Sequence, residues 1–133
     1  MTPVFVDSSF WIAFRSNNQT DHGRAVTMVQ RLYAERALFV TSYLAFAEMH
    51  AHFARIPLLR EQVTRDFREA PETRLENPDI GDYAAAFALL TQYSDKTFSF
   101  CDAVSFVIMR RLQIRRVLSL DDHFRQIAEF EVL

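Results

Sequence analysis

Four acidic residues lie in or beside apolar segments of the sequence, three of them where a strand is expected to end or a helix to begin and one about two turns into an expected helix. They are Asp7, Glu48, Asp102 and Asp121. Two carboxylates about 5 Å apart repel each other by roughly 3 kcal/mol at an effective dielectric near 20, so a cluster of them needs compensation. Protons or divalent cations must supply it, and hard cations such as Mg²⁺ or Mn²⁺ prefer carboxylate and water oxygens. Such a site supports in-line hydrolysis of phosphodiesters, in which metal ions activate water and stabilise the leaving oxygen.

Short buried strands alternate with helices along the chain. We expect strands just before Asp7 and at residues 37–41, 73–76, 116–120 and 130–133. We expect helices at residues 10–14, 25–36, 42–53, 57–70, 77–93, 99–113 and 124–128, with Asn77 as the N-cap of the fifth and Pro78 as its first residue. This alternation predicts an α/β fold with a doubly wound, mostly parallel sheet of about five strands flanked by helices. The carboxyl ends of parallel strands share one edge, so all four acids can meet there.

Length and composition indicate one domain spanning residues 1–133. About half of the residues are apolar, which is enough for one full core. No apolar run approaches the roughly 18 residues of a membrane span, and Asp7 interrupts the apolar stretch where a signal peptide would be continuous. With a single cysteine and no internal disulfide, we expect a cytoplasmic protein. The net charge of −2 argues against a generally basic nucleic-acid-binding protein.

The basic residues cluster locally. The densest group is formed by Arg110, Arg111, Arg115 and Arg116. One interpretation is a solvated helix end, where cations favour the C-terminal dipole. The other is a rim that contacts RNA phosphates.

Each acid also has a purely structural interpretation. Ser99-x-x-Asp102 fits a capping box, in which the serine and the acid satisfy helix N-terminal amides, and Ser119-x-x-Asp122 fits it as well. Asp7 fits the N-cap of the helix that follows it. Glu48 lies too deep in its helix to cap, so its structural alternative is a buried salt bridge to an arginine. The sequence leaves these alternatives open.

Four motifs in order carry a family resemblance. They are Val4-Phe5-Val6-Asp7-Ser8-Ser9, Ala45-Phe46-Ala47-Glu48, Ser99-Phe100-Cys101-Asp102-Ala103 and Leu118-Ser119-Leu120-Asp121-Asp122-His123-Phe124. Together they resemble the PIN-domain ribonucleases of the VapC toxin type. The resemblance implies a Mg²⁺- or Mn²⁺-dependent endoribonuclease acting on RNA, usually the toxin of a toxin–antitoxin pair. The catalytic and metal-binding acids would then be Asp7, Glu48, Asp102 and Asp121, although register alone could exchange Asp121 with Asp122.

The resemblance also implies supporting residues and partners. Ser8 and Ser119 stand where such domains commonly place a small hydroxyl residue beside the metal site, and they would act through water. A cognate antitoxin would bind near Tyr43–Leu59, and the protein would form a homodimer. Gln113 departs from the pattern, because a glycine often ends the preceding helix.

Other residues and functions are less favoured. His50 and His52 face different sides of a helix, Cys101 fits a small buried hydrophobic position, and His123 fits a surface position at a helix end better than a general base. Rival functions for the same fold are a non-catalytic module that binds RNA or protein, and a stand-alone RNA-processing nuclease. A dehalogenase-type phosphatase would need an acid at Ser9, and a response-regulator receiver would need a lysine after a late strand.

Overall fold

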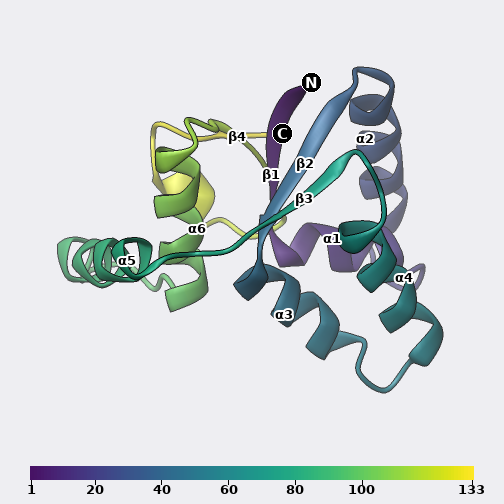
Figure 1. Cartoon of the computed structure of the whole chain (residues 1–133), viewed down its shortest axis with the longest axis horizontal. Helices are drawn as coiled ribbons and strands as arrows, with labels where there is room; N and C mark the ends of the chain where they lie inside the picture. The colour runs from purple at the N-terminus through teal and green to yellow at the C-terminus, as the bar shows by residue number, and fades with distance from the viewer.

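The computed structural model describes residues 1–133 and contains one five-stranded sheet in which every neighbouring pair of strands is parallel. The strand order is β3-β2-β1-β4-β5 (Figure 1). The strands are β1 (Thr2–Val6), β2 (Ala37–Ser42), β3 (Thr73–Glu76), β4 (Arg116–Leu118) and β5 (Glu131–Val132). The predicted doubly wound α/β fold is confirmed, and it matches the expected five strands.

Helices cover both faces of the sheet. They are α1 (Ser8–Arg15), α2 (His22–Ala34), α3 (Tyr43–His52), α4 (Pro57–Arg68), α5 (Ile80–Gln92), α6 (Phe100–Arg111) and the single 3₁₀ turn η1 (Phe124–Gln126). Helices α1 to α4 pack around one core cluster, while α5, α6 and η1 pack around the other. Figure 1 shows the second group on the left of the sheet and α1, α2 and α4 on the right.

Strand β1 is the centre of the sheet and is buried on both faces. Val4 and Val6 belong to the core under α1 to α4, whereas Phe5 belongs to the core under α5 and α6. Successive side chains of a strand point to opposite faces, so a strand covered on both sides needs a continuous apolar run. This requirement explains the unbroken hydrophobic sequence before Asp7.

Two predicted boundaries are wrong for identifiable reasons. Helix α5 begins at Ile80 and not at Pro78, because Asp79 is its N-cap: Asp79 Oδ1 accepts a hydrogen bond from the Asp82 amide (2.8 Å), and Asp82 Oδ2 accepts one from the Asp79 amide (3.0 Å). Strand β4 ends at Leu118 and not at residue 120, because the Leu120 amide donates to Ser9 Oγ (3.0 Å) and leaves the sheet. The predicted helix at residues 124–128 is only the turn η1.

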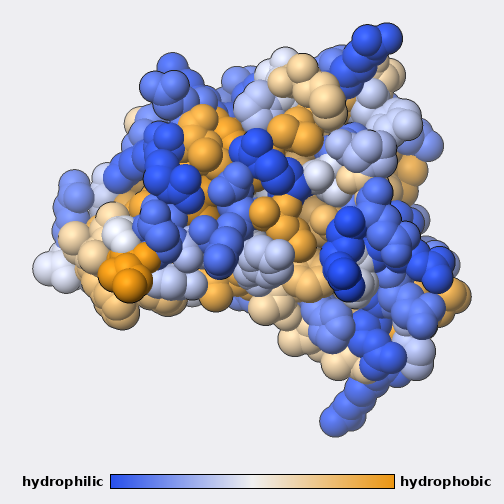
Figure 2. Space-filling view, viewed as in Figure 1, coloured by the Kyte–Doolittle hydropathy of each residue, from blue (hydrophilic) through white to orange (hydrophobic).

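The surface is largely hydrophilic, and apart from Met1 and Tyr33 its exposed large apolar side chains lie in two regions. Tyr43, Ile56 and Leu58 are exposed on α3, α4 and the turn between them, and Ile80 and Phe87 are exposed on α5. Figure 2 shows an apolar patch at the left of the molecule, over the position of α5. No helix combines the length and the hydrophobicity required to cross a membrane.

Candidate active site

The candidate site lies at the carboxyl edge of the sheet, where the chain leaves β1 and β4. These strands are neighbours, but the chain runs from β1 outward to β2 and β3 before it returns to form β4 on the other side of β1. Ligands of open α/β sheets bind in the crevice that this reversal of strand order creates. The Asp7 amide donates a hydrogen bond to the Leu118 carbonyl (2.9 Å), so the ends of the two strands are held together.

Asp7 is the most buried acid of the site, with 3% of its surface exposed. Its Oδ2 atom accepts hydrogen bonds from Ser9 Oγ (2.7 Å) and from Ser119 Oγ (2.9 Å). Burial, followed by the negative charge of Asp121, raises the pKa of Asp7 to about 7, although the two serine hydrogen bonds act in the opposite direction. Asp7 is the N-cap residue of α1, as predicted, but its side chain makes no capping hydrogen bond, so capping does not occupy the carboxylate.

Asp102 combines a structural contact with a place in the site. The predicted capping box is present: Ser99 Oγ accepts from the Asp102 amide (3.0 Å), and Asp102 Oδ2 accepts from the Ser99 amide (2.9 Å). The same Oδ2 atom lies 2.6 Å from His123 Nδ1. The capping box therefore fixes the carboxylate of Asp102 and does not remove it from the cluster.

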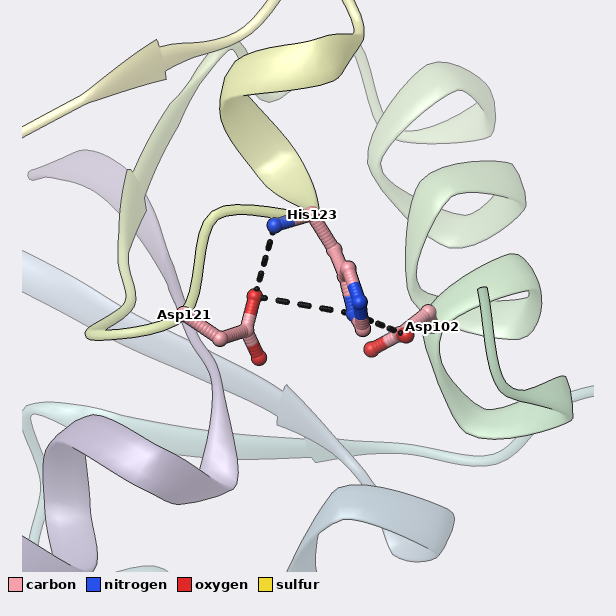
Figure 3. A group of neighbouring side chains, drawn as sticks. All are labelled: Asp102, Asp121 and His123. Atoms are coloured by element: carbon pink, nitrogen blue, oxygen red, sulfur yellow. Dashed lines mark hydrogen bonds and ion pairs between the residues drawn. The ribbon is translucent and has the colours of Figure 1, made fainter. Parts of the chain in front are cut away.

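Asp121 lies on the loop after β4 and faces Asp102 across the ring of His123 (Figure 3). Its Oδ1 atom accepts a hydrogen bond from the His123 amide (3.0 Å) and lies 3.8 Å from His123 Nδ1. The Asp121 amide donates to Ser119 Oγ (3.2 Å), which is itself bonded to Asp7. A chain of short contacts thus joins three of the four predicted acids.

Glu48 reaches the same edge from α3, which follows β2, the neighbour of β1 on the side away from β4. Its Oε1 atom accepts hydrogen bonds from Ser8 Oγ (2.8 Å) and from the thiol of Cys101 (3.3 Å). Burial and the negative charge of Glu48 raise the pKa of the Cys101 thiol, with smaller contributions from the charges of Asp7 and Asp102. Glu48 forms no ion pair with an arginine, so the salt-bridge interpretation is wrong. Cys101 is half-buried and bonded to Glu48, so it is more than the small hydrophobic residue that we expected.

No arginine or lysine compensates the negative charge of the cluster. None of the four carboxylates is paired with an arginine or a lysine, and His123 is the only basic side chain within ion-pairing distance of any of them. His123 Nδ1 is also buried without a hydrogen-bond partner. Carboxylate oxygens together with an unpartnered buried nitrogen form a donor set that fits a divalent cation.

Two residues of the site, Ser9 and His123, were not predicted from the sequence. Ser9, and not Ser8, bonds to Asp7, whereas Ser8 bonds to Glu48. His123 is the N-cap residue of η1, so the expected helix-end position is confirmed, but its side chain is only 28% exposed and lies between two carboxylates, so the expected surface position is wrong. Ser9 stands two positions after Asp7, and His123 stands two positions after Asp121. Asp121 Oδ1 accepts from the backbone amide two positions later, which is a common turn of aspartate, and this spacing was the available signal for His123. Ser9 contacts Asp7 through its side chain, which this turn does not predict.

Asp121 and Asp122 are distinguished by their surroundings. Asp121 is half-buried and contacts His123, whereas Asp122 is exposed and makes no side-chain hydrogen bond or ion pair. The predicted capping box between Ser119 and Asp122 is absent, because Ser119 Oγ bonds to Asp7 and to the Asp121 amide. The structure therefore places Asp121 in the cluster, and Asp122 outside it.

The arginine cluster lies at the opposite end of the sheet from the four acids, at the end of α6 and the start of β4. Arg110 pairs with Glu129 (2.6 Å), and Arg111 makes two 2.9 Å hydrogen bonds to Asp82. Arg115 donates to the Glu129 carbonyl (3.2 Å), and Arg116 lies 4.0 Å from Glu35. These arginines are not on the rim of the acidic site, and their contact with RNA stays a prediction.

Both the sequence and the fold are similar to those of known proteins. The family model described as PIN domain matches residues 4–130. The 23S rRNA-specific endonuclease VapC20 of Mycobacterium tuberculosis, in strains CDC 1551 / Oshkosh and H37Rv, is 28% identical over 131 residues, which are 97% of each chain. The crystal structure of Mycobacterium tuberculosis VapC20, a Sarcin-Ricin loop cleaving toxin, is similar at a TM-score of 0.83 and 27% identity, covering 96% of both chains.

Two more distant structures share the fold. A toxin–antitoxin complex from Klebsiella pneumoniae is similar at a TM-score of 0.71 and 17% identity, covering 98% of this chain and 95% of that chain. FitAcB from Neisseria gonorrhoeae is similar at a TM-score of 0.71 and 16% identity, covering 98% of this chain and 96% of that chain.

Proposed function

Because the chain belongs to the PIN-domain family, we propose that it is a metal-dependent endoribonuclease, a hydrolase acting on RNA phosphodiester bonds and the toxin of a toxin–antitoxin pair. The observation that carries the proposal is the gathering of four carboxylates at the switch point of the sheet, without arginine or lysine to neutralise them. Similarity along 97% of the chain to a 23S rRNA-specific endonuclease supports the same reaction.

Each residue of the site has a role in this proposal. The metal ligands are Asp7, Glu48, Asp102 and Asp121. Mg²⁺ or Mn²⁺ bound to them would supply an activated water and charge stabilisation for the leaving oxygen. Ser9 and Ser119 orient the Asp7 carboxylate through their hydrogen bonds, and Ser8 orients Glu48. Outer partners of this kind fix the direction of metal-binding oxygens, so they are positioning residues.

The similar proteins suggest a substrate and partners for this chain. We propose a loop of ribosomal RNA as the first substrate to test, because the similar endonuclease is specific for 23S rRNA. We also propose an antitoxin that binds near Tyr43–Leu59, a homodimer, and a cytoplasmic location. Exposed Tyr43, Ile56 and Leu58 support binding of a partner at the α3–α4 corner, since apolar side chains of this size favour burial.

The proposal is tested by incubating purified protein with total RNA and with ribosomes, in Mn²⁺, in Mg²⁺ and in EDTA. Asp7→Asn removes the central carboxylate, and Asp122→Asn is the matched control because Asp122 is exposed and outside the cluster. We expect metal-dependent cleavage by the wild type and by Asp122→Asn, and loss of at least a hundredfold in rate for Asp7→Asn. Circular dichroism confirms that both variants are folded.

Two outcomes would redirect the proposal. Cleavage that persists in EDTA would contradict metal dependence, and absence of cleavage with any RNA and metal would favour a module that only binds RNA or protein. The toxin role is tested separately by inducible expression in bacteria. Growth arrest by the wild type but not by Asp7→Asn supports a toxin, whereas cleavage without arrest would support a stand-alone RNA-processing nuclease.

A further inference from the structure

The ring of His123 lies between two acids of the cluster (Figure 3). Its Nδ1 atom is 2.6 Å from Asp102 Oδ2 and 3.8 Å from Asp121 Oδ1, and single ligand atoms from the three residues all lie within 4.8 Å of one another. The side chain is 28% exposed, but Nδ1 itself is buried. The nitrogen is therefore directed into the carboxylate cluster and away from solvent.

Three contacts hold the imidazole in this orientation. The His123 amide donates to Asp121 Oδ1 (3.0 Å), and the ring packs edge-to-face against Phe98 with centroids 5.6 Å apart. On the other side of the ring, Nε2 lies 3.5 Å from Thr97 Oγ1. A histidine that binds a metal usually has its second ring nitrogen held by another polar group, and Thr97 occupies that position here.

The 2.6 Å contact between His123 Nδ1 and Asp102 Oδ2 has the distance of an ion pair but not the alignment of a hydrogen bond. Two ligands of one ion at bond lengths of about 2.1 Å are about 3 Å apart when adjacent and about 4 Å apart when opposite. Both observed separations, 2.6 and 3.8 Å, are below the larger of these values. A shared cation would satisfy the nitrogen and both carboxylates together.

We propose that His123 Nδ1 is a ligand of the metal ion held by Asp102 and Asp121, and that this nitrogen makes the site prefer first-row transition-metal ions such as Mn²⁺ over Mg²⁺. Imidazole is a common ligand of transition metals, whereas Mg²⁺ is bound almost entirely by oxygen. This inference rests on the proposed function, because it takes the carboxylate cluster as the metal site. It adds a nitrogen ligand and a metal preference that carboxylates alone do not provide.

The test uses Mn²⁺ as a spectroscopic probe in protein labelled with ¹⁵N-histidine. Pulsed electron paramagnetic resonance detects ¹⁵N coupling when a histidine nitrogen binds Mn²⁺ directly. We compare the wild type with His123→Asn and with His52→Asn, whose histidine is exposed on the helix that carries Glu48. Coupling is expected in the wild type and in His52→Asn, and it should disappear in His123→Asn.

Calorimetry on the same proteins measures affinity for each ion. We expect His123→Asn to weaken Mn²⁺ binding at least tenfold and to change Mg²⁺ binding by less than threefold. If His123→Asn weakened the binding of Mn²⁺ and of Mg²⁺ by the same factor, the proposed preference for Mn²⁺ would be overturned. Wild-type protein that binds Mn²⁺ without ¹⁵N coupling, or coupling that survives in His123→Asn, would overturn the nitrogen ligand and leave the nuclease proposal intact.

The two proposals fail in distinguishable ways. If the wild type binds neither ion, the metal site itself is wrong, and both proposals are overturned. If His123→Asn does not fold, the spectrum of the wild type still shows whether a histidine nitrogen binds Mn²⁺. Loss of the ¹⁵N coupling in His52→Asn would show that the ligand is His52, which would overturn the proposal for His123. His123→Gln then replaces His123→Asn as the variant.

Discussion

Ser119 Oγ donates a 2.9 Å hydrogen bond to Asp7 Oδ2, although 112 positions separate the two residues in the sequence. The contact joins the ends of β1 and β4, the two strands at the point where the order of the sheet reverses. Ser119 also accepts a hydrogen bond from the Asp121 amide (3.2 Å). One hydroxyl group therefore sets the relative position of two carboxylates that we propose as metal ligands.

Replacing Ser119 tests that positioning. Ser119→Ala removes a hydrogen bond that favours the charged form of Asp7, so the pKa of Asp7 should rise further above its ordinary value. We expect Mn²⁺ affinity at pH 7 to fall about tenfold, which is typical for loss of an outer hydrogen-bond partner of a metal ligand. Isothermal titration calorimetry measures the change. Ser94→Ala, at an exposed serine of a loop, is the control, and equal affinities for the two variants would contradict the role of Ser119.

The raised pKa of Asp7 predicts a pH dependence of stability. In the folded protein its pKa is about 7, against an ordinary value of 3.8, so the folded state binds this proton more tightly than the unfolded state does. Metal-free stability should therefore fall as the pH rises from about 4 to 7, and the cost of the buried charge should then stay constant, on the order of 4 kcal/mol. Asp7→Asn removes this charge.

Urea unfolding in EDTA at several pH values measures that cost. We expect Asp7→Asn to be more stable than the wild type at pH 8 by a few kcal/mol, with the difference shrinking towards zero near pH 4. Added Mn²⁺ should stabilise the wild type and have little effect on the variant, because a ligand that binds only the folded state shifts the equilibrium towards it. A difference that is independent of pH would show that Asp7 is not the responsible group.

Asp121 and Asp122 give a sharp comparison between neighbouring acids. Asp121 contacts His123 and contributes to the raised pKa of Asp7, whereas Asp122 is exposed without such contacts. We expect Asp121→Asn to lower kcat for RNA cleavage at least a hundredfold and Asp122→Asn to change it less than twofold. Single-turnover cleavage with saturating Mn²⁺ separates this effect from weakened metal binding. The reverse ranking would assign the fourth acid to Asp122.

The fold was predictable from the sequence because its pattern is redundant. The central strand has to be apolar on both faces, and Val4, Phe5 and Val6 meet that need together. Boundaries were less predictable where two signals competed. Pro78 is a favoured first residue of a helix, but the reciprocal bonds of Asp79 and Asp82 place the start two residues later. Local propensity cannot decide between such alternatives.

The four acids of the site were predictable, but several of their partners were not. Strand ends identify Asp7 and Asp121, because the direction of parallel strands places them at one edge. The positions of Ser9 and His123 depend on the turns after those acids and on side-chain rotamers, which periodicity does not encode. The dense arginine cluster was equally uninformative, since its acidic partners, such as Asp82 and Glu129, come from distant parts of the chain.

Arg111 should contribute to stability through Asp82. Asp82 is buried, with 3% of its side chain exposed, while the Arg111 side chain is 39% exposed. Burial acts to raise the pKa of Asp82, but the hydrogen bonds from Arg111 and from the Asp79 amide outweigh it, so the pKa is lowered. Arg111→Met leaves the Asp82 carboxylate without its arginine partner. We expect the free energy of unfolding to fall by about 2 kcal/mol at pH 7, which is between the losses typical of breaking exposed and buried ion pairs.

The pH dependence provides the check on Arg111. The stabilisation exists above the ordinary pKa of an aspartate and is lost as the pH falls through the lowered value, so Arg111→Met should differ less from the wild type at pH 3. Urea unfolding at both pH values measures this difference. Arg125→Met is the control, because Arg125 is exposed and forms no ion pair. A variant with full stability but raised KM for RNA would instead favour the predicted phosphate contact.

Gln113 ends α6 in a conformation that suits glycine. Its φ angle is +57°, in the left-handed region. The Gln113 amide donates to the Arg110 carbonyl (3.2 Å) and the Ile114 amide donates to the Met109 carbonyl (2.8 Å), which together form a Schellman motif. This backbone conformation favours glycine, because glycine has no Cβ atom to crowd the neighbouring carbonyl oxygen. Glutamine there pays a steric cost that glycine avoids.

We therefore expect Gln113→Gly to stabilise the protein by about 0.5 to 1 kcal/mol, because relief of roughly 1 to 2 kcal/mol of strain is partly offset by the greater freedom of glycine in the unfolded chain. Gln113→Ala keeps a Cβ atom and should not stabilise. Arg36, with a φ of +59° after α2, offers an independent position, and Arg36→Gly should behave in the same way. Urea unfolding at pH 7 measures all three variants. Destabilisation by both glycine substitutions would show that the side chains contribute more than the strain costs.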